Sequence, residues 1–414
     1  MKTIIRRTVL TVLALCLLLG AAGGVHAAGF TDVPANAYYA KAVAWAVDRG
    51  ITTGTSATTF SPKNVCTRAD AVTFLWRFDY SPHYGKDFSF TDVSSSAYYY
   101  KAVRWAVDKG VTAGVSAREF RPGAPCTRAQ IVMMLWSYVG QPRVSGSVPF
   151  RDVPADSYYV DAVRWAAKKG ITAGTSPTTF GPNETCTRAQ IVTMLYKLDG
   201  ILPAKKLVVI DPGHQRKGNY DKEPIGPGSS ELKAKCSSGT YGKTSRLNEY
   251  ELNLTVSFQL REALERRGYR VLMTRESHDV DLSNIQRAQF ANNNGADIAV
   301  RIHANGSDNT AKNGAMTINM TKNNPYNKYL YTKSRFLSDC IVNRMCSQTG
   351  AKNNGVWDTD TMTGINWSTV PVTIVEMGYM TNPTEDKNMA SASYQAKIVE
   401  GICDGVDEYF ANYG

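Results

Sequence analysis

Two histidines and one glutamate in this sequence directly follow apolar runs that read as strands. The run LVVIDPG leads to His214, DIAVRI leads to His303, and VTIV leads to Glu376. In open α/β sheets, functional sites form beyond the carboxyl ends of the strands. We therefore expect these three side chains to gather at one edge of a sheet.

Two histidines and one carboxylate are a common ligand set for catalytic zinc, which leaves one coordination position open for water. Glu249 opens a predicted helix and could complete the set. Its spacing from Glu251 puts the two carboxylates on different helix faces, so only one should point into the site. Glu376 could then take a proton from the water. The residues alone leave ordinary roles open as well, a hydrogen-bonding histidine or a helix N-terminal carboxylate.

These residues lie in a region, from Leu207 onward, where strand-like and helical runs alternate, which predicts an α/β domain with a central, mostly parallel sheet. The polar stretch 215–248, rich in Gly, Ser and Lys, is predicted to be a surface loop. The expected strands are 207–211, 269–274, 297–302, 315–319 and 372–375, and the expected helices are 249–267, 282–293, 326–348 and 394–410.

The motifs LVVIDPGH, NEYELNL, Thr274-Arg275, RIHANG and IVEMGYMTN follow one another between residues 207 and 411. In kind and order they resemble the zinc-dependent N-acetylmuramoyl-L-alanine amidases of the amidase-3 type. The resemblance implies one zinc ion, with His214, Glu249 and His303 as its ligands and Glu376 as the catalytic residue. It also implies a reaction, hydrolysis of the amide bond between N-acetylmuramic acid and L-alanine in peptidoglycan.

The sequence departs from this family at three places near the site. Gln215 and Arg216 stand where two glycines are frequent, Arg301 stands where serine is common, and the segment between His214 and Glu249 is longer than in many members. Asp211 is predicted either to orient His214 or to cap a loop. Arg275, Arg287 and Arg301 are candidates for binding carboxylates of the stem peptide, and the alternative for each is a paired or solvated arginine.

The first half of the chain contains an internal repeat with a period of about 60 residues. Each block is predicted to form two helices, the second opened by a threonine cap, and the three blocks to pack around a shared axis. The repeated positions are Phe30, Phe90 and Phe150; Asp32, Asp92 and Asp152; Trp45, Trp105 and Trp165; and the Cys-Thr-Arg-Ala motifs at 66–69, 126–129 and 186–189.

These blocks resemble S-layer homology domains over about residues 29–200. The resemblance implies an all-α three-fold bundle that binds a secondary cell-wall polysaccharide. The alternative for the arginines is an internal ion pair, such as Arg68 with Asp32, and the tryptophans are read as core residues. The candidate polymer-binding residues are Arg68, Arg128, Arg188, Asp32, Asp92 and Asp152.

The predicted organisation begins with a secretory signal peptide at 1–27, because a basic segment, an apolar run and a small-x-small site follow one another there. The boundaries that follow are 28–88, 89–148 and 149–200 for the repeats, 201–206 for a linker and 207–414 for the catalytic domain. No other stretch is predicted to span a membrane, so the mature protein is expected to be secreted to the bacterial cell wall.

The net charge of +11 lies mainly in the repeats. For an exported protein this favours an acidic wall polymer over nucleic acid as the partner. Cys66, Cys126 and Cys186 are read as small buried residues in three separate cores, and the other cysteines do not require a disulfide. Two rival functions remain: a wall-binding surface protein with an inactive amidase-like domain, and a zinc peptidase that cuts within the stem peptide.

Overall fold

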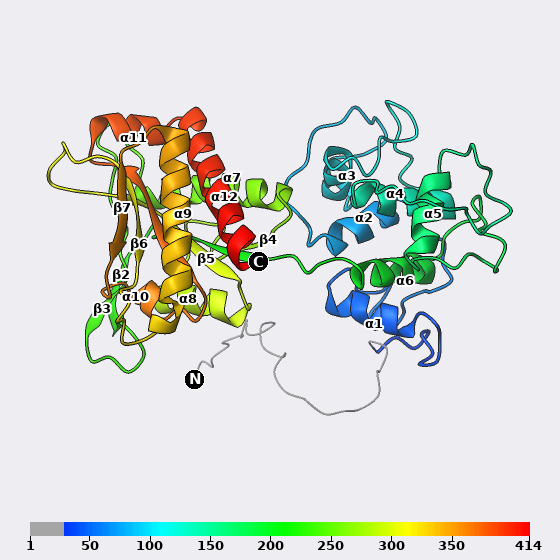
Figure 1. Ribbon diagram of the computed structural model, residues 1–414, viewed down its shortest axis with the longest axis horizontal. Coiled ribbons are helices and arrows are strands. Elements are labelled where there is room, and N and C mark those ends of the chain that lie inside the picture. Colours follow the sequence, from blue (N-terminus) through cyan, green and yellow to red (C-terminus); the bar gives the residue numbers. More distant parts are fainter. Residues whose placement is uncertain (1–28) are drawn as a thin grey trace, which may run out of the picture.

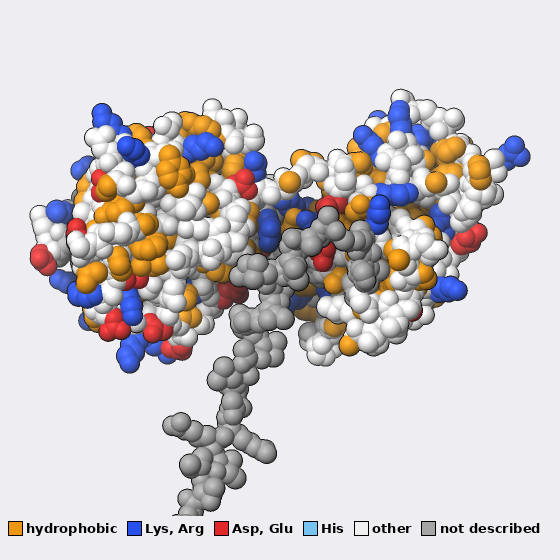
Figure 2. Space-filling view, turned by 90° about the horizontal axis from the view of Figure 1, so that it is seen from below, with side chains coloured by type: hydrophobic (Ala, Val, Ile, Leu, Met, Phe, Trp, Pro, Cys, Tyr) orange, Lys and Arg blue, Asp and Glu red, His pale blue; other side chains and the backbone are white. Residues whose placement is uncertain are grey.

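The computed structural model describes residues 29–414, so the predicted signal peptide lies outside the described residues. The chain forms two units joined by a short connection, a helical unit and an α/β unit (Figure 1). Basic side chains are scattered over the face of both units drawn in Figure 2 and do not form a single stripe there. No described helix is long and apolar enough to cross a membrane.

The helical unit is built from three equivalent helix pairs. In each pair the second helix begins with a complete capping box. The side chain of Thr67, Thr127 or Thr187 accepts a hydrogen bond from the backbone amide three residues later, and the side chain of that later residue accepts one from the backbone amide of the threonine. Trp105 and Trp165 are buried, as the core interpretation predicts, whereas Trp45 is only partly buried against the same core. The helices are α1 (Ala40–Asp48), α2 (Arg68–Phe78), α3 (Tyr100–Asp108), α4 (Arg128–Tyr138), α5 (Val160–Lys168) and α6 (Arg188–Asp199).

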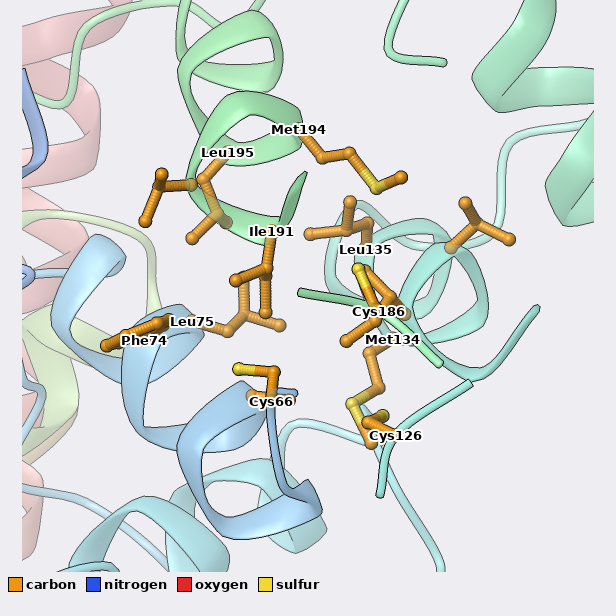
Figure 3. Packing of buried hydrophobic residues seen from close by; sticks show 14 of the residues in the cluster. Cys66, Phe74, Leu75, Cys126, Met134, Leu135, Cys186, Ile191, Met194 and Leu195 are labelled. Carbon is orange, nitrogen blue, oxygen red and sulfur yellow. The ribbon is translucent and has the colours of Figure 1, made fainter. Parts of the chain in front are cut away.

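The three repeated cysteines meet at the centre of this unit (Figure 3). The amide of Cys66 donates to the carbonyl of Cys186, that of Cys126 to Cys66, and that of Cys186 to Cys126, at 2.8–2.9 Å. The prediction of separate cores was therefore wrong, because the repeats close a ring of backbone hydrogen bonds around one shared core. The thiols of all seven described cysteines are free and buried.

The α/β unit is organised around a six-stranded sheet in the order β4-β1-β5-β8-β6-β7. All neighbouring strands run parallel except β6 and β8, which confirms the predicted mostly parallel sheet. These strands are β1 (Leu207–Pro212), β4 (Arg270–Met273), β5 (Ile298–Asn305), β6 (Ala315–Asn319), β7 (Asn353–Asp358) and β8 (Val372–Tyr379).

Helices cover both faces of the sheet. One face packs with α7, α9 and α12 in a core that includes Ile210, Val300 and Val375, and the other packs with α8, α10 and η1 around Val209 and Ile374. The helices are α7 (Glu249–Arg266), α8 (Asn284–Asn293), η1 (Lys328–Leu330), α9 (Tyr331–Thr349), α10 (Thr363–Asn366), α11 (Pro383–Met389) and α12 (Ala392–Tyr413).

The segment 215–248 is not simply a surface loop. It carries an antiparallel hairpin of β2 (Asn219–Pro224) and β3 (Leu232–Cys236). Sequence patterns also miss β7, α10 and α11. They place every other strand and helix of the α/β unit within a few residues, with two larger differences. The helix predicted from residue 326 begins five residues later, at Tyr331, and β8 continues four residues beyond its predicted end, to Tyr379.

The two units touch through charged side chains at the far end of α7. His83 donates its backbone N–H to Glu265 at 2.7 Å, and its ring nitrogen Nδ1 lies 2.9 Å from the same carboxylate. Arg266 pairs with Asp108, and Lys205 of the connection pairs with the buried Asp79 at 2.7 Å. The helical unit therefore contacts α7 at its carboxyl end.

Candidate active site

The structure brings together His214, Glu249 and His303. His214 follows β1, His303 lies near the end of β5, and Glu249 is the first residue of α7. Nε2 of His214 lies 3.1 Å from Oε1 of Glu249 and 3.1 Å from Nδ1 of His303. Nδ1 of His303 lies 3.2 Å from the same oxygen of Glu249. The three donor atoms form a nearly equilateral triangle.

Such a triangle fits a metal ion. Ligand atoms about 2.0–2.1 Å from a tetrahedral zinc stand about 3.3 Å from one another, close to the spacing seen here. Two further polar atoms at this place, Nε2 of His303 and Oε2 of Glu376, are buried and have no hydrogen-bond partner among the described residues. Among residues 29–414, His214, Glu249 and His303 form the one group of three or more His, Cys, Asp or Glu side chains that could hold a metal.

Backbone amides fix the Glu249 carboxylate. Asn248 caps α7 and Glu251 returns to the cap amide, so Glu251 is used for capping and Glu249 is left to point into the site. Oε2 of Glu249 accepts from the amide of Thr240 at 2.8 Å, and Oε1 accepts from the amide of Ala304 at 3.1 Å. These contacts hold the oxygen that faces the two histidines.

The His214 ring is oriented by the 215–248 segment. Its Nδ1 donates to the carbonyl of Ser237 at 2.9 Å, which turns Nε2 towards the site. His214 has a φ of +61°, a conformation that is uncommon for residues other than glycine. The preceding Gly213 cannot carry a side chain, because a Cβ there would lie 2.2 Å from the His303 ring.

Burial and charge act in opposite directions on the two histidines. Burial disfavours a charged His214, but the adjacent Glu249 carboxylate outweighs this and raises the pKa of His214 to about 10. Burial lowers the pKa of His303 to about 4. Burial also opposes a charged Glu249, yet its contacts with His214 and His303 bring the pKa of Glu249 below its usual range. Without a metal, the cluster therefore holds an ionised Glu249 carboxylate next to a protonated His214 and a neutral His303.

Glu376 lies beside the triangle on the neighbouring strand. It is the direct cross-strand partner of His303 in the β5–β8 ladder. Burial, followed by repulsion from Glu249, raises the pKa of Glu376 to about 8. A carboxyl group with a pKa near neutrality can take up and release a proton at physiological pH.

A cavity of about 350 Å³ opens next to this cluster. His214, His303 and Glu376 line it on one side, and all lining residues belong to the α/β unit. Glu249 and Arg266 stand at opposite ends of α7, about 25 Å apart at 1.5 Å per residue. The contacts between the two units are therefore remote from the cavity.

Asp211 does not orient His214, so that prediction was wrong. Its carboxylate accepts from Arg287 and from Arg301, both at 2.8 Å, and from the hydroxyl of Thr274 at 2.5 Å. The reason is its place inside β1, where it points into a buried cluster under the cavity floor. Burial opposes its charge, but Arg287 and Arg301 bring the pKa of Asp211 far below its usual range.

Two of the three candidate arginines cannot reach a substrate. Arg275 is buried and donates to the carbonyls of Pro212, Gly213 and Tyr250. Arg287 is buried and donates to Asp211 and to the carbonyl of His214 at 3.0 Å. Both brace the turn that carries His214, so for these two the alternative of an internally paired arginine is confirmed and the candidate role of binding a substrate carboxylate is not. Only Arg301 lines the cavity.

Replacement Asp211→Asn is expected to destabilise the α/β unit by about 3–5 kcal/mol at pH 7, because it leaves two buried guanidinium groups without their carboxylate. The folded-state pKa of Asp211 is depressed, so its contribution is complete above the unfolded value of about 3.9 and is lost as the pH falls. Urea unfolding at pH 7, 4, 3 and 2 should show nearly the same gap between wild type and variant at pH 7 and 4, and a gap that shrinks at pH 3 and 2. Asp279→Asn, at the exposed pair with Arg216, is the control. An equal gap at every pH would contradict the prediction.

The cavity walls were not foreseen from the sequence. One wall is the β3 strand with Lys233, Ala234 and Cys236, and the opposite wall is the segment from Thr361 to Gly364. Nζ of Lys233 donates to the carbonyl of Thr361 at 2.7 Å, so the two walls are tied together. Ser237, which orients His214, belongs to the same inserted segment.

In the helical unit, the three repeated arginines hold neighbouring repeats together. Nε of Arg68 donates to the carbonyl of Phe120 at 2.7 Å, and its guanidinium lies 4.8 Å from the centre of that ring. Arg128 and Arg188 make the same contacts with Phe180 and Phe60. The alternative of an ion pair between Arg68 and Asp32 was wrong. The carboxylates of Asp32, Asp92 and Asp152 instead each accept from two backbone amides of their own repeat.

Both units match known families. Residues 208–408 match the sequence profile of the family described as N-acetylmuramoyl-L-alanine amidase. Residues 29–72, 89–132 and 149–192 each match the profile of the S-layer homology domain.

Individual relatives divide in the same way. The chain is 28% identical over 203 residues to N-acetylmuramoyl-L-alanine amidase LytC of Bacillus subtilis (strain 168), a match that covers 49% of this chain and 35% of LytC. It is 33% identical over 108 residues to the surface-layer 125 kDa protein of Lysinibacillus sphaericus, covering 25% of this chain and 9% of that protein. The crystal structure of N-acetylmuramoyl-L-alanine amidase from Clostridium difficile 630 is 27% identical, with a TM-score of 0.42, covering 51% of this chain and 99% of that one.

Proposed function

We propose that the hydrolytic centre of this chain is a zinc site. The chain belongs to the N-acetylmuramoyl-L-alanine amidase family through residues 208–408, and it carries three S-layer homology domains. His214, Glu249 and His303 would hold the ion, and Glu376 would act as the general base. The bond cleaved is the amide between N-acetylmuramic acid and L-alanine in peptidoglycan.

The observation that carries this proposal is the triangle of donor atoms, with edges of 3.1–3.2 Å, beside a cavity that His214 and His303 line. Its chemistry suits zinc, because two imidazoles and a carboxylate with one open side are a common catalytic zinc environment. When bound, zinc lowers the pKa of a water molecule and polarises the carbonyl of the substrate.

The protein's own groups supply the proton transfer. Glu376 lies beside His303 and has an oxygen without a hydrogen-bond partner, so it can accept a proton from the attacking water. The same carboxyl group can then return the proton to the departing amine of L-alanine. Ser237 and the amide of Ala304 keep His214 and Glu249 in place during these steps.

The experiment that tests this function is digestion of purified peptidoglycan by the full chain, followed by mass spectrometry of the products. We expect intact stem peptides with a free L-alanine amino terminus, release that stops with a chelator, and recovery on adding zinc. Fragments cut within the stem would support the peptidase alternative. If walls of several compositions gave no product despite bound zinc, the inactive surface protein would be the better reading.

The S-layer homology domains imply a cell-surface location. We propose that they bind a secondary cell-wall polysaccharide there. This proposal also requires that residues 1–27 direct export of the chain. The mainly positive charge of the repeats favours an acidic polymer. We expect the Glu376→Gln chain, which should leave the wall undigested, to sediment with purified walls. Prior removal of the secondary polymer should abolish sedimentation. Undiminished binding to stripped walls would overturn this proposal.

A further inference from the structure

The cavity floor is made of two layers of side chains from the sheet. His303 and Glu376 form the first layer, where the hydrolytic chemistry is proposed, and they are paired across β5 and β8. Two residues earlier on each strand, Arg301 pairs with Ile374, and Ile374 pairs with Ile318 of β6. All five line the cavity. Because residues two apart in a strand point to the same face, the second layer lies about 6.6 Å from the first.

Arg301 presents an unused part of its guanidinium at this second layer. Its side chain is 6% exposed. Its Nε donates to Asp211 at 2.8 Å and its Nη2 donates to Asn284 at 2.7 Å. Nη1 makes no hydrogen bond with any described residue and lies against Gly364, where a Cβ would come within 1.6 Å of it.

The charge under the floor is unbalanced. Arg287 and Arg301 share the single carboxylate of Asp211, and Arg275 is buried nearby, where burial and then Arg287 lower its pKa to about 10. Glu376 is the only acidic residue among those that line the cavity, and the ammonium group of Lys233 on the cavity wall is already engaged by the carbonyl of Thr361. An anion bound in the second layer would therefore be stabilised by its surroundings.

The distance between the layers matches a position in the substrate. From the nitrogen of the scissile amide, an α-carboxylate on the second residue of the stem peptide lies two residues along the chain, about 7 Å when extended. We propose that Arg301 binds a free carboxylate on that second residue, so that the enzyme prefers stems in which this group is unmodified over stems in which it is an amide. This inference rests on the proposed amidase function.

The test uses two N-acetylmuramoyl-L-alanyl peptides that differ only in whether the second residue carries a free α-carboxylate or its amide. For the wild-type full chain loaded with zinc, we expect kcat/KM to be about 10- to 100-fold higher for the free carboxylate, as for a hydrogen bond between charged groups. Arg301→Lys, which keeps a charge against Asp211 but loses the forked donors, should reduce this ratio to a few-fold. It should change turnover of the amide much less.

Two further variants guard against a folding defect. Gly364→Ala, which crowds Nη1 without removing the arginine, should also lower the ratio. Lys233→Met, on the opposite wall, should leave the ratio within a factor of about two. A ratio near one in wild type, with both peptides cleaved, would overturn the inference and leave the amidase function standing. Loss of the ratio in Lys233→Met but not in Arg301→Lys would also overturn it. Failure to cleave either peptide would count against the amidase function itself.

Discussion

Glu376→Gln is expected to lower kcat on peptidoglycan by about 10²- to 10⁴-fold while zinc content stays at one per chain. The amide of glutamine has nearly the same shape as the carboxyl group but cannot accept the proton from water. Glu376 is not one of the three groups whose donor atoms form the triangle, so the metal site should persist. Peptide release and zinc content measured on the same preparation check both halves of this expectation.

The same replacement should not weaken the fold. Burial and repulsion from Glu249 raise the pKa of Glu376, so the metal-free folded state holds a proton that the unfolded chain releases. The pKa of Glu376 is about 8 in the folded state and about 4.3 in the unfolded chain. As the pH rises from the lower to the higher value, Glu376 therefore lowers the free energy of unfolding progressively. Metal-free Glu376→Gln should therefore melt above wild type at pH 8.

Glu408→Gln, at an exposed pair with Arg344, provides a control that should change neither activity nor melting. Wild-type turnover in Glu376→Gln would show that another group takes the proton. Loss of zinc together with activity would show instead that Glu376 supports the metal site, and the assignment of a base would have to be revised.

The position of the site follows from sequence because the chemistry-bearing residues sit at the ends of apolar runs. A parallel sheet aligns the carboxyl ends of its strands, so His214, His303 and Glu376 are brought to one edge whatever the detailed strand order. Glu249 is predictable for a related reason. Asn248 and Glu251 supply a capping box, which fixes where α7 begins and which carboxylate is left free.

The surroundings of the site are harder to read, because they depend on contacts between distant segments. The polar composition of 215–248 suggests a loop, yet the alternation in Leu232–Cys236 is a strand pattern that a period-two search could have found. The carbonyl of Ser237 orients His214, and a backbone carbonyl carries no signal in residue type. Likewise, nothing in the sequence says that Asp211 meets Arg287 and Arg301 rather than His214.

The repeats show the same division between pattern and packing. The 60-residue period predicts equivalent positions and a shared axis, and both are present. It does not say how close to the axis each position lies. Cys66, Cys126 and Cys186 lie close enough to exchange backbone hydrogen bonds, and this closeness explains why a small, apolar side chain stands there.

His303→Ala is expected to abolish tight zinc binding and to lower peptide release by at least about 10³-fold at neutral pH. The replacement removes one corner of the donor triangle, so only Nε2 of His214 and Oε1 of Glu249 remain, 3.1 Å apart. Two ligands hold zinc poorly, and without the metal the pKa of water stays far above neutrality. Zinc content after dialysis and the rate of peptide release are the two measurements.

A thermal readout separates loss of metal from loss of fold. A ligand that binds only the folded state raises stability in proportion to the logarithm of its concentration over Kd. Wild type should therefore melt at higher temperature as zinc is added, whereas His303→Ala should not respond. His278→Ala is the matched control, because that ring packs edge-on against Tyr250 and contributes no atom to the triangle. A zinc-dependent rise in melting temperature for His303→Ala equal to that of His278→Ala would show that His303 is not a ligand, and the metal would then have to be held without the β5 strand.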